Sequence, residues 1–139
     1  MSYLLDTNVL SELRKGAHIN PAVSAWYATI DANSIYLSVL VTAEIRRGIE
    51  GLRRREPERA TTLDEWLEAV IEGFADRILP IDAAVAERWA YLTAGRSFPV
   101  VDALLAATAD VHRLVLVTRN RADVADLGVA VLNPFEPAA

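Results

Sequence analysis

Short apolar runs alternate with longer segments of helical periodicity along most of the chain. The runs predict five short strands, at about residues 2–5, 35–39, 77–81, 114–118 and 129–133. Strands that are short, almost wholly apolar and separated by helices are typical of a parallel sheet buried on both faces. The pattern therefore predicts an α/β protein whose sheet is covered by helices on each side.

Between these runs, apolar positions recur three or four residues apart, as on one face of a helix. Asn20 is expected to cap the second helix, and Pro99 to lie in the first turn of a later one. Gly16 is expected to end the first helix, and Gly128 the last. The predicted helices cover about residues 8–15, 21–31, 41–54, 57–74 and 83–94, a segment starting at 99, and 120–128.

The chain shows no internal repeat, no low-complexity segment and no linker, and 139 residues are enough for one hydrophobic core. We therefore expect a single domain over residues 1–139, an α/β/α sandwich around a central, mostly parallel five-stranded sheet. The absence of cysteine excludes disulfides, thiolate metal sites and thiol nucleophiles. No targeting or membrane-spanning segment is evident, so we expect a cytoplasmic protein without a membrane partner.

Four acidic residues are expected at one edge of this sheet. Asp6 directly follows the first strand, Glu44 lies early in the helix after the second, Asp102 lies in the first turn after Pro99, and Asp123 follows the fourth strand. Open parallel sheets bind ligands outside the carboxyl ends of their strands, near the point where strand order reverses. The four acids are therefore candidates for one site.

Each acid taken alone also has a structural explanation. Asp6 could cap the first helix, Asp102 could interact with a helix dipole, Asp123 could cap with Asn120, and Glu44 could pair with Arg47. Taken together they indicate a cation, because clustered carboxylates repel one another unless a cation neutralises them. An all-oxygen ligand set favours Mg²⁺ or Mn²⁺, and such an ion suits phosphodiester hydrolysis.

At these residues the chain resembles the PIN-domain ribonucleases, and within them the VapC/FitB-type toxins of toxin–antitoxin modules. The resemblance covers nearly the whole chain through four motifs, YLLDTNVLSEL, SVLVTAEIRRGIE, GRSFPVVDALLAATA and LVTRNRADVADLGVAVLNPF. It implies Mg²⁺- or Mn²⁺-dependent RNA cleavage, a homodimer, and a small cognate antitoxin whose tail occupies the active-site groove.

The resemblance also implies a role for each motif residue. Asp6, Glu44, Asp102 and Asp123 form the acidic metal site, where hydrogen bonds come from Thr7, Asn8, Thr118 or Asn120. Relatives often have an aromatic residue after the fourth acid, whereas this chain has Val124. Asp126 is therefore the alternative to Asp123.

The net charge of −5 argues against nucleic acid as a partner, since phosphate binding is usually supported by a basic surface. Setting the four candidate acids aside leaves 15 acidic against 14 basic residues, so the remaining surface is near neutral. Arg46, Arg47 and Arg53 are candidates for contacts with RNA phosphates or an acidic antitoxin segment. Solvation of an arginine-rich helix face is the competing interpretation.

Acidic residues at the edge of a parallel sheet also occur in proteins with other functions. An aspartyl-phosphate phosphatase or a phospho-acceptor domain is disfavoured, because Asn8 stands where a second acid is needed and Lys15 is poorly placed to hold phosphate. A domain that binds RNA or a protein without cleavage, and a solitary RNA-processing nuclease, are the remaining alternatives.

Overall fold

The computed structural model describes residues 1–137 and contains one five-stranded sheet within them. The strand order is β3-β2-β1-β4-β5, and all four strand pairings are parallel. The strands are β1 (Tyr3–Leu5), β2 (Ile35–Ser38), β3 (Ile78–Leu79), β4 (Val115–Val117) and β5 (Val131–Leu132). The predicted α/β sandwich with five strands is confirmed, and its sheet is parallel throughout.

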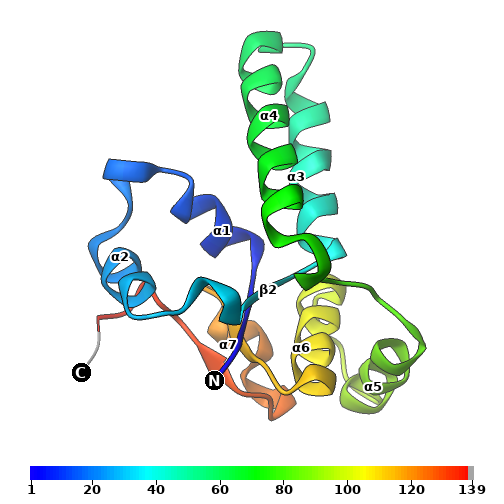
Figure 1. Ribbon diagram of the computed structural model, residues 1–139. Helices are drawn as coiled ribbons and strands as arrows, with labels where there is room; N and C mark the ends of the chain where they lie inside the picture. The colour runs from blue at the N-terminus through cyan, green and yellow to red at the C-terminus, as the bar shows by residue number, and fades with distance from the viewer. Residues whose placement is uncertain (138–139) are drawn as a thin grey trace.

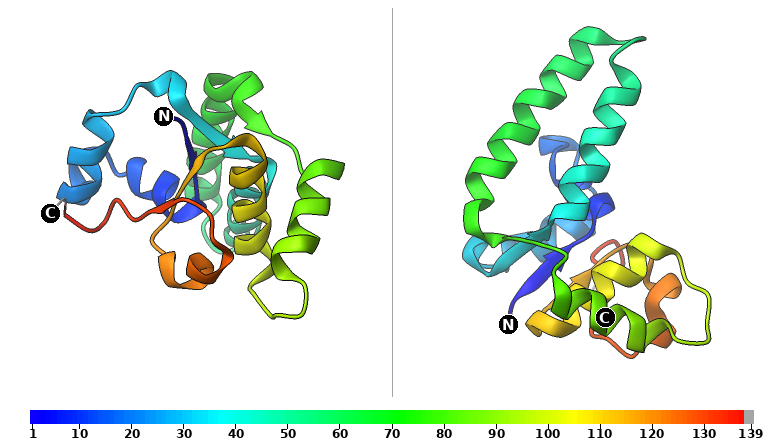
Figure 2. Two further views of the ribbon diagram at one scale, coloured as in Figure 1. Left: turned by 90° about the horizontal axis from the view of Figure 1, so that it is seen from below. Right: turned by 90° about the vertical axis from the view of Figure 1, so that its right-hand side faces the viewer.

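Seven α-helices flank these strands in the described part of the chain. In two views, α1 and α2 lie on one side of the strands, and α5 and α6 on the other (Figures 1 and 2). The helices are α1 (Thr7–Leu13), α2 (Pro21–Ala28), α3 (Val39–Leu52), α4 (Pro57–Phe74), α5 (Ala83–Thr93), α6 (Val100–His112) and α7 (Arg121–Val124). No helix among residues 1–137 is long and apolar enough to cross a membrane.

Helix ends differ from the sequence-based boundaries by a few residues, for identifiable reasons. Ser38 accepts a hydrogen bond from the amide of Leu40, and this cap lets α3 begin two residues earlier than predicted. Pro99 lies at the cap position of α6 rather than in its first turn. Asn20 caps α2 as expected, and Gly128 follows the last helical turn at a φ of 74°.

The core lies between the sheet and the helices. Leu4 and Leu5 of β1 and Leu37 of β2 are completely buried, which fits strands covered on both faces. Helix α6 buries a stripe of small residues beside the strands, including Ala103, Ala106, Ala107 and Ala109. These small side chains let α6, and with it Asp102, lie close to the strands.

Helices α3 and α4 form a long hairpin that projects from the sheet (Figures 1 and 2). Asp64 of α4 joins the two helices, because it accepts hydrogen bonds from Arg46 at 2.5 Å and from Arg53 at 2.8 and 2.9 Å. Both arginines also bond Glu50. These four side chains form a brace that holds α3 and α4 together. Because α3 directly follows β2, the brace also sets the direction of the helix that carries Glu44.

Candidate functional site

Asp6 lies at the point where the strand order reverses. From β1, the following strands β2 and β3 build the sheet in one direction, whereas β4 and β5 build it in the other. Leu5 at the end of β1 pairs with Val117 at the end of β4, so the next residues, Asp6 and Thr118, leave the sheet side by side. Ligands of open parallel sheets bind at this kind of position.

The carboxylate of Asp6 is buried and held by three donors. Its Oδ1 accepts the amide of Thr7 at 2.7 Å, so Asp6 does cap α1. Its Oδ2 accepts the hydroxyl of Thr118 at 2.7 Å and the side-chain amide of Asn8 at 3.3 Å. These bonds compensate for burial and fix the orientation of the carboxylate. The capping role and a place in the site are therefore compatible.

Hydrogen bonds extend from Asp6 to the neighbouring elements. The hydroxyl of Thr7 donates to Oε1 of Glu44 at 2.7 Å, which connects α1 with α3. The side-chain oxygen of Asn8 accepts the amide of Arg119 at 3.2 Å, and Thr118 accepts the amide of Asn120 at 3.0 Å. The predicted residues Thr7, Asn8 and Thr118 thus orient acids or loop backbone through their side chains, whereas Asn120 participates through its backbone.

The four predicted acids share one electrostatic environment. Burial, and after it the carboxylates of Asp6, Asp123 and Glu44 in that order, together raise the pKa of Asp102 to about 6. Glu44 and Asp123 are exposed, whereas Asp6 is buried and Asp102 is half-buried. Asp126 is not among the groups that act on Asp102. The fold therefore brings Asp123, rather than the alternative Asp126, toward the other three acids.

The side chains of the acidic site determine whether a metal ion could bind there. Over residues 1–137, no three His, Cys, Asp or Glu side chains are arranged closely enough to hold a metal as they stand. The four carboxylates nevertheless provide an all-oxygen donor set, and after burial the charges of the other three contribute to the raised pKa of Asp102. A hard divalent cation suits both features, since it prefers oxygen ligands and relieves the repulsion.

The arginines predicted to contact RNA or antitoxin differ in their surroundings. Arg46 and Arg53 are engaged with Asp64 and Glu50 in the brace between α3 and α4. Arg47 is exposed and forms no ion pair in the described part of the chain. The structure thus gives Arg46 and Arg53 a structural role, and Arg47 is the one of the three with an uncommitted guanidinium.

Glu12 on α1 is a buried acid that the sequence pattern does not reveal. Its carboxylate accepts the amide of Asn20 at 3.0 Å and the ammonium of Lys15 at 2.9 Å. The backbone hydrogen bond from Asn20, followed by the bond from Lys15, lowers the pKa of this carboxyl. Glu12 therefore joins α1 to the start of α2, and Lys15 serves as its counterion.

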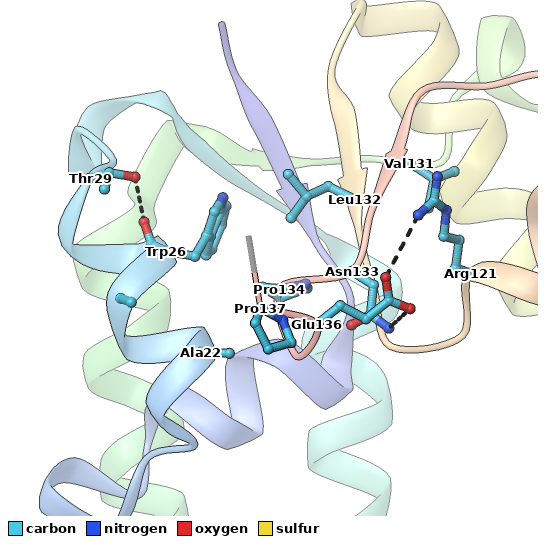
Figure 3. A pocket seen from close by; sticks show the side chains of 11 residues that line it. Ala22, Trp26, Thr29, Arg121, Val131, Leu132, Asn133, Pro134, Glu136 and Pro137 are labelled. Carbon is cyan, nitrogen blue, oxygen red and sulfur yellow. Dashed lines mark hydrogen bonds and ion pairs between the residues drawn. The ribbon is translucent and has the colours of Figure 1, made fainter. Parts of the chain in front are cut away.

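A separate cavity of about 670 Å³ lies between α2 and the C-terminal segment (Figure 3). Trp26 of α2 and Leu132 of β5 line it, together with Pro134 and Pro137. The ion pair between Arg121 and Glu136, at 3.9 Å, lies at its margin (Figure 3). None of the four acids lines this cavity, so it is distinct from the acidic site.

Comparison with known proteins identifies the class to which this fold and site belong. The family model of the PIN domain matches residues 3–127, and the chain belongs to this family. The chain is 35% identical to the VapC ribonuclease Y4jK of Sinorhizobium fredii over 97% of its own length and 99% of that protein. It is 36% identical to toxin FitB of Neisseria gonorrhoeae, over 95% of this chain and 97% of that protein.

A solved structure supports the same relationship. The structure of FitAB bound to a DNA fragment superposes with a TM-score of 0.87 at 34% sequence identity, covering 99% of this chain and 98% of that one. The match extends over strands and helices on both sides of the acidic edge. The family predicted from the four motifs is therefore confirmed.

Proposed function

We propose that the protein is a divalent-metal-dependent ribonuclease that hydrolyses RNA phosphodiester bonds. The observation that carries this proposal is the meeting of Asp6, Glu44, Asp102 and Asp123 in one electrostatic environment at the switch point of a parallel sheet. The similarity to a VapC ribonuclease over nearly the full chain supports the same activity.

Mg²⁺ or Mn²⁺ would be held by Asp6, Glu44, Asp102 and Asp123. When bound, such an ion stabilises negative charge on a phosphodiester and makes water a stronger nucleophile. Asp6 provides a carboxylate whose direction is fixed by Thr7, Asn8 and Thr118. Preorganised groups of this kind avoid reorientation during the reaction.

The remaining acids differ in how freely they can move. Thr7 holds Glu44 through a single hydrogen bond from α1, so the carboxylate stays near Asp6 although it is exposed. Asp102 is the half-buried member, and its pKa of about 6 lets it exchange a proton near neutral pH. Cation binding favours its ionised form, because metal ligands must be deprotonated.

The test of the proposed activity is RNA cleavage by purified protein freed of any copurifying inhibitor. Structured and unstructured RNAs are incubated with Mg²⁺ or Mn²⁺, beside an Asp6→Asn/Asp102→Asn double variant of equal folded content. We expect cleavage by the wild type and none by the variant. Equal survival of RNA in both reactions would support a domain that binds RNA or protein without cleavage.

We further propose that the protein is the toxin of a toxin–antitoxin pair, acting in the cytoplasm as a homodimer. Similarity to FitB and to the toxin–antitoxin complex FitAB supports this role.

The toxin role has its own test. Expression of the chain should arrest growth, and coexpression of a short DNA-binding protein encoded upstream should restore it. Light scattering of the purified chain checks the homodimer. Absence of such a neighbouring gene, together with harmless expression of an active nuclease, would favour a solitary RNA-processing enzyme.

A further inference from the structure

Arg119, which follows Thr118 after β4, is a cationic residue whose backbone lies beside the acidic site. Its amide donates to the side-chain oxygen of Asn8, and Asn8 in turn donates to the carboxylate of Asp6. The backbone of Arg119 is therefore connected to Asp6 through one intervening side chain.

The guanidinium of Arg119 is also oriented by the C-terminal segment. Its central carbon lies 3.7 Å from the ring centroid of Phe135, which covers one face of the planar cation. Phe135 is itself held by a hydrogen bond from its amide to the side chain of Asn133 and by packing against the core. A stacked guanidinium keeps the donors along its edges available for a planar or tetrahedral anion.

The positive charge of Arg119 is not neutralised by an ion pair. No carboxylate of residues 1–137 lies within ion-pair distance of its guanidinium. The charge of Arg119 contributes to the lowered pKa of Glu12, but Glu12 is already paired with Lys15. Arg121, two residues later, provides a contrast because Glu136 binds it at 3.9 Å (Figure 3). Two arginines that are two residues apart thus differ: Arg121, at the start of α7, has an acidic partner, whereas Arg119 in the preceding loop forms no ion pair within residues 1–137.

We propose that Arg119 binds an RNA phosphate next to the scissile one and so positions the strand over the acidic site. This inference rests on the proposed ribonuclease function. Four carboxylates repel the polyanion they are expected to cut, so a nearby fixed cation is needed to hold the adjoining backbone. RNA carries a negative charge on every nucleotide, so one phosphate can bind Arg119 while its neighbour lies at the acidic site. An acidic protein segment has no such regular backbone charge, and RNA is therefore the better match.

The role of Arg119 is tested by measuring RNA binding in a variant that is expected not to cleave. In an Asp102→Asn background, the affinity for a labelled, mixed-sequence single-stranded RNA is measured over a series of salt concentrations. Arg119→Gln should weaken binding by roughly tenfold, the loss expected for a charge-assisted hydrogen bond. It should also reduce the slope of log affinity against log salt by about 0.7, the value for one phosphate contact to a single strand.

Two further variants separate charge from orientation. Phe135→Leu removes the stacking surface but keeps the cation, so binding should weaken by a smaller factor while the salt slope stays unchanged. Arg121→Gln is the matched control from the start of α7, two residues away, and it should leave RNA affinity unchanged because Glu136 is the partner of that side chain. Circular dichroism and thermal unfolding confirm that every variant is folded.

Failure of this inference can be told apart from failure of the proposed function. Unchanged RNA affinity in Arg119→Gln, or an equal loss in Arg121→Gln, overturns the assignment even if the wild type cuts RNA. A variant that binds RNA normally but loses a coexpressed antitoxin makes Arg119 a protein contact and overturns it as well. RNA that is bound through Arg119 but never cut refutes the nuclease, and with it the position of Arg119 next to a scissile phosphate, although the RNA contact itself is then established.

Discussion

The hydroxyl of Thr118 donates a 2.7 Å hydrogen bond to Oδ2 of Asp6, across the pair of strands where the sheet order reverses. Both residues are almost completely buried, at 1% and 6% exposed. The same hydroxyl oxygen accepts the amide of Asn120. Thr118 therefore connects the carboxylate of Asp6 to the loop that leads to Asp123.

Replacement of Thr118 by valine should affect both stability and cleavage. Thr118→Val retains the shape of the side chain but leaves Asp6 and the amide of Asn120 each without one partner. The free energy of unfolding should fall by about 1–3 kcal/mol, as for other buried polar groups that lose a partner. Urea unfolding measures the loss. Thr118→Ser keeps the hydroxyl and should behave like the wild type; equal activity of the valine and serine variants would contradict this role.

Asp102 should make the metal-free protein less stable as pH rises. Its pKa is raised from 3.8 to about 6, so between these values the folded protein retains a proton that the unfolded chain has released. Stability contributed by the protonated carboxyl is complete below the unfolded pKa and is lost as pH rises through the folded one. Asp102→Asn should therefore raise the melting temperature above about pH 6 and not below about pH 4. Identical pH profiles for variant and wild type would contradict the raised pKa.

Divalent cations should stabilise the folded protein without any substrate. A ligand that binds only the native state raises the melting temperature as its concentration rises. Mg²⁺ and Mn²⁺ should do so for the wild type, and Ca²⁺ serves to compare cation size. Asp6→Asn should abolish the shift, whereas Asp126→Asn should retain it because Asp126 does not act on Asp102. A full shift in Asp6→Asn would remove Asp6 from the ligand set.

The brace between α3 and α4 should weaken with salt and with acid. Arg53 and Arg46, in that order, lower the pKa of Asp64, so its stabilising effect is present above the unfolded pKa and is lost as pH falls. Asp64→Asn should lower the melting temperature in dilute buffer near neutral pH. The difference from the wild type should shrink in high salt, since exposed ion pairs are screened. A difference that does not depend on salt would point to packing instead.

The sequence predicted the fold class because each strand and helix carries its own local pattern. The apolar strands and the caps at Asn20 and Gly128 are properties of adjacent residues, and these features appear in the structure. The order of the strands was not predictable in this way. Crossovers in a parallel sheet can continue in either direction, and only packing of the whole chain places β4 beside β1.

The candidate site shows the same division between local and long-range information. Its acids were recognisable because each follows a strand or opens a helix in a family motif. The bond from Arg46 to Asp64 spans 18 residues, and the contact between Arg119 and Phe135 depends on where the C-terminal segment lies. The periodicity of the sequence does not reveal such partners. The sequence therefore predicts Arg46 as a contact for RNA or antitoxin and does not single out Arg119.

The bond between Asp6 and Thr118 spans 112 residues, so almost the whole chain must be synthesised before it can form. A chain still growing on a ribosome carries Asp6, Glu44 and Asp102 before the strand that completes their surroundings has been made. In the proposed ribonuclease, Thr118 and Asp123 would therefore be the last parts of the acidic site to be synthesised. A chain that ends before β4 lacks both of them, so it cannot yet form the site that the finished chain has.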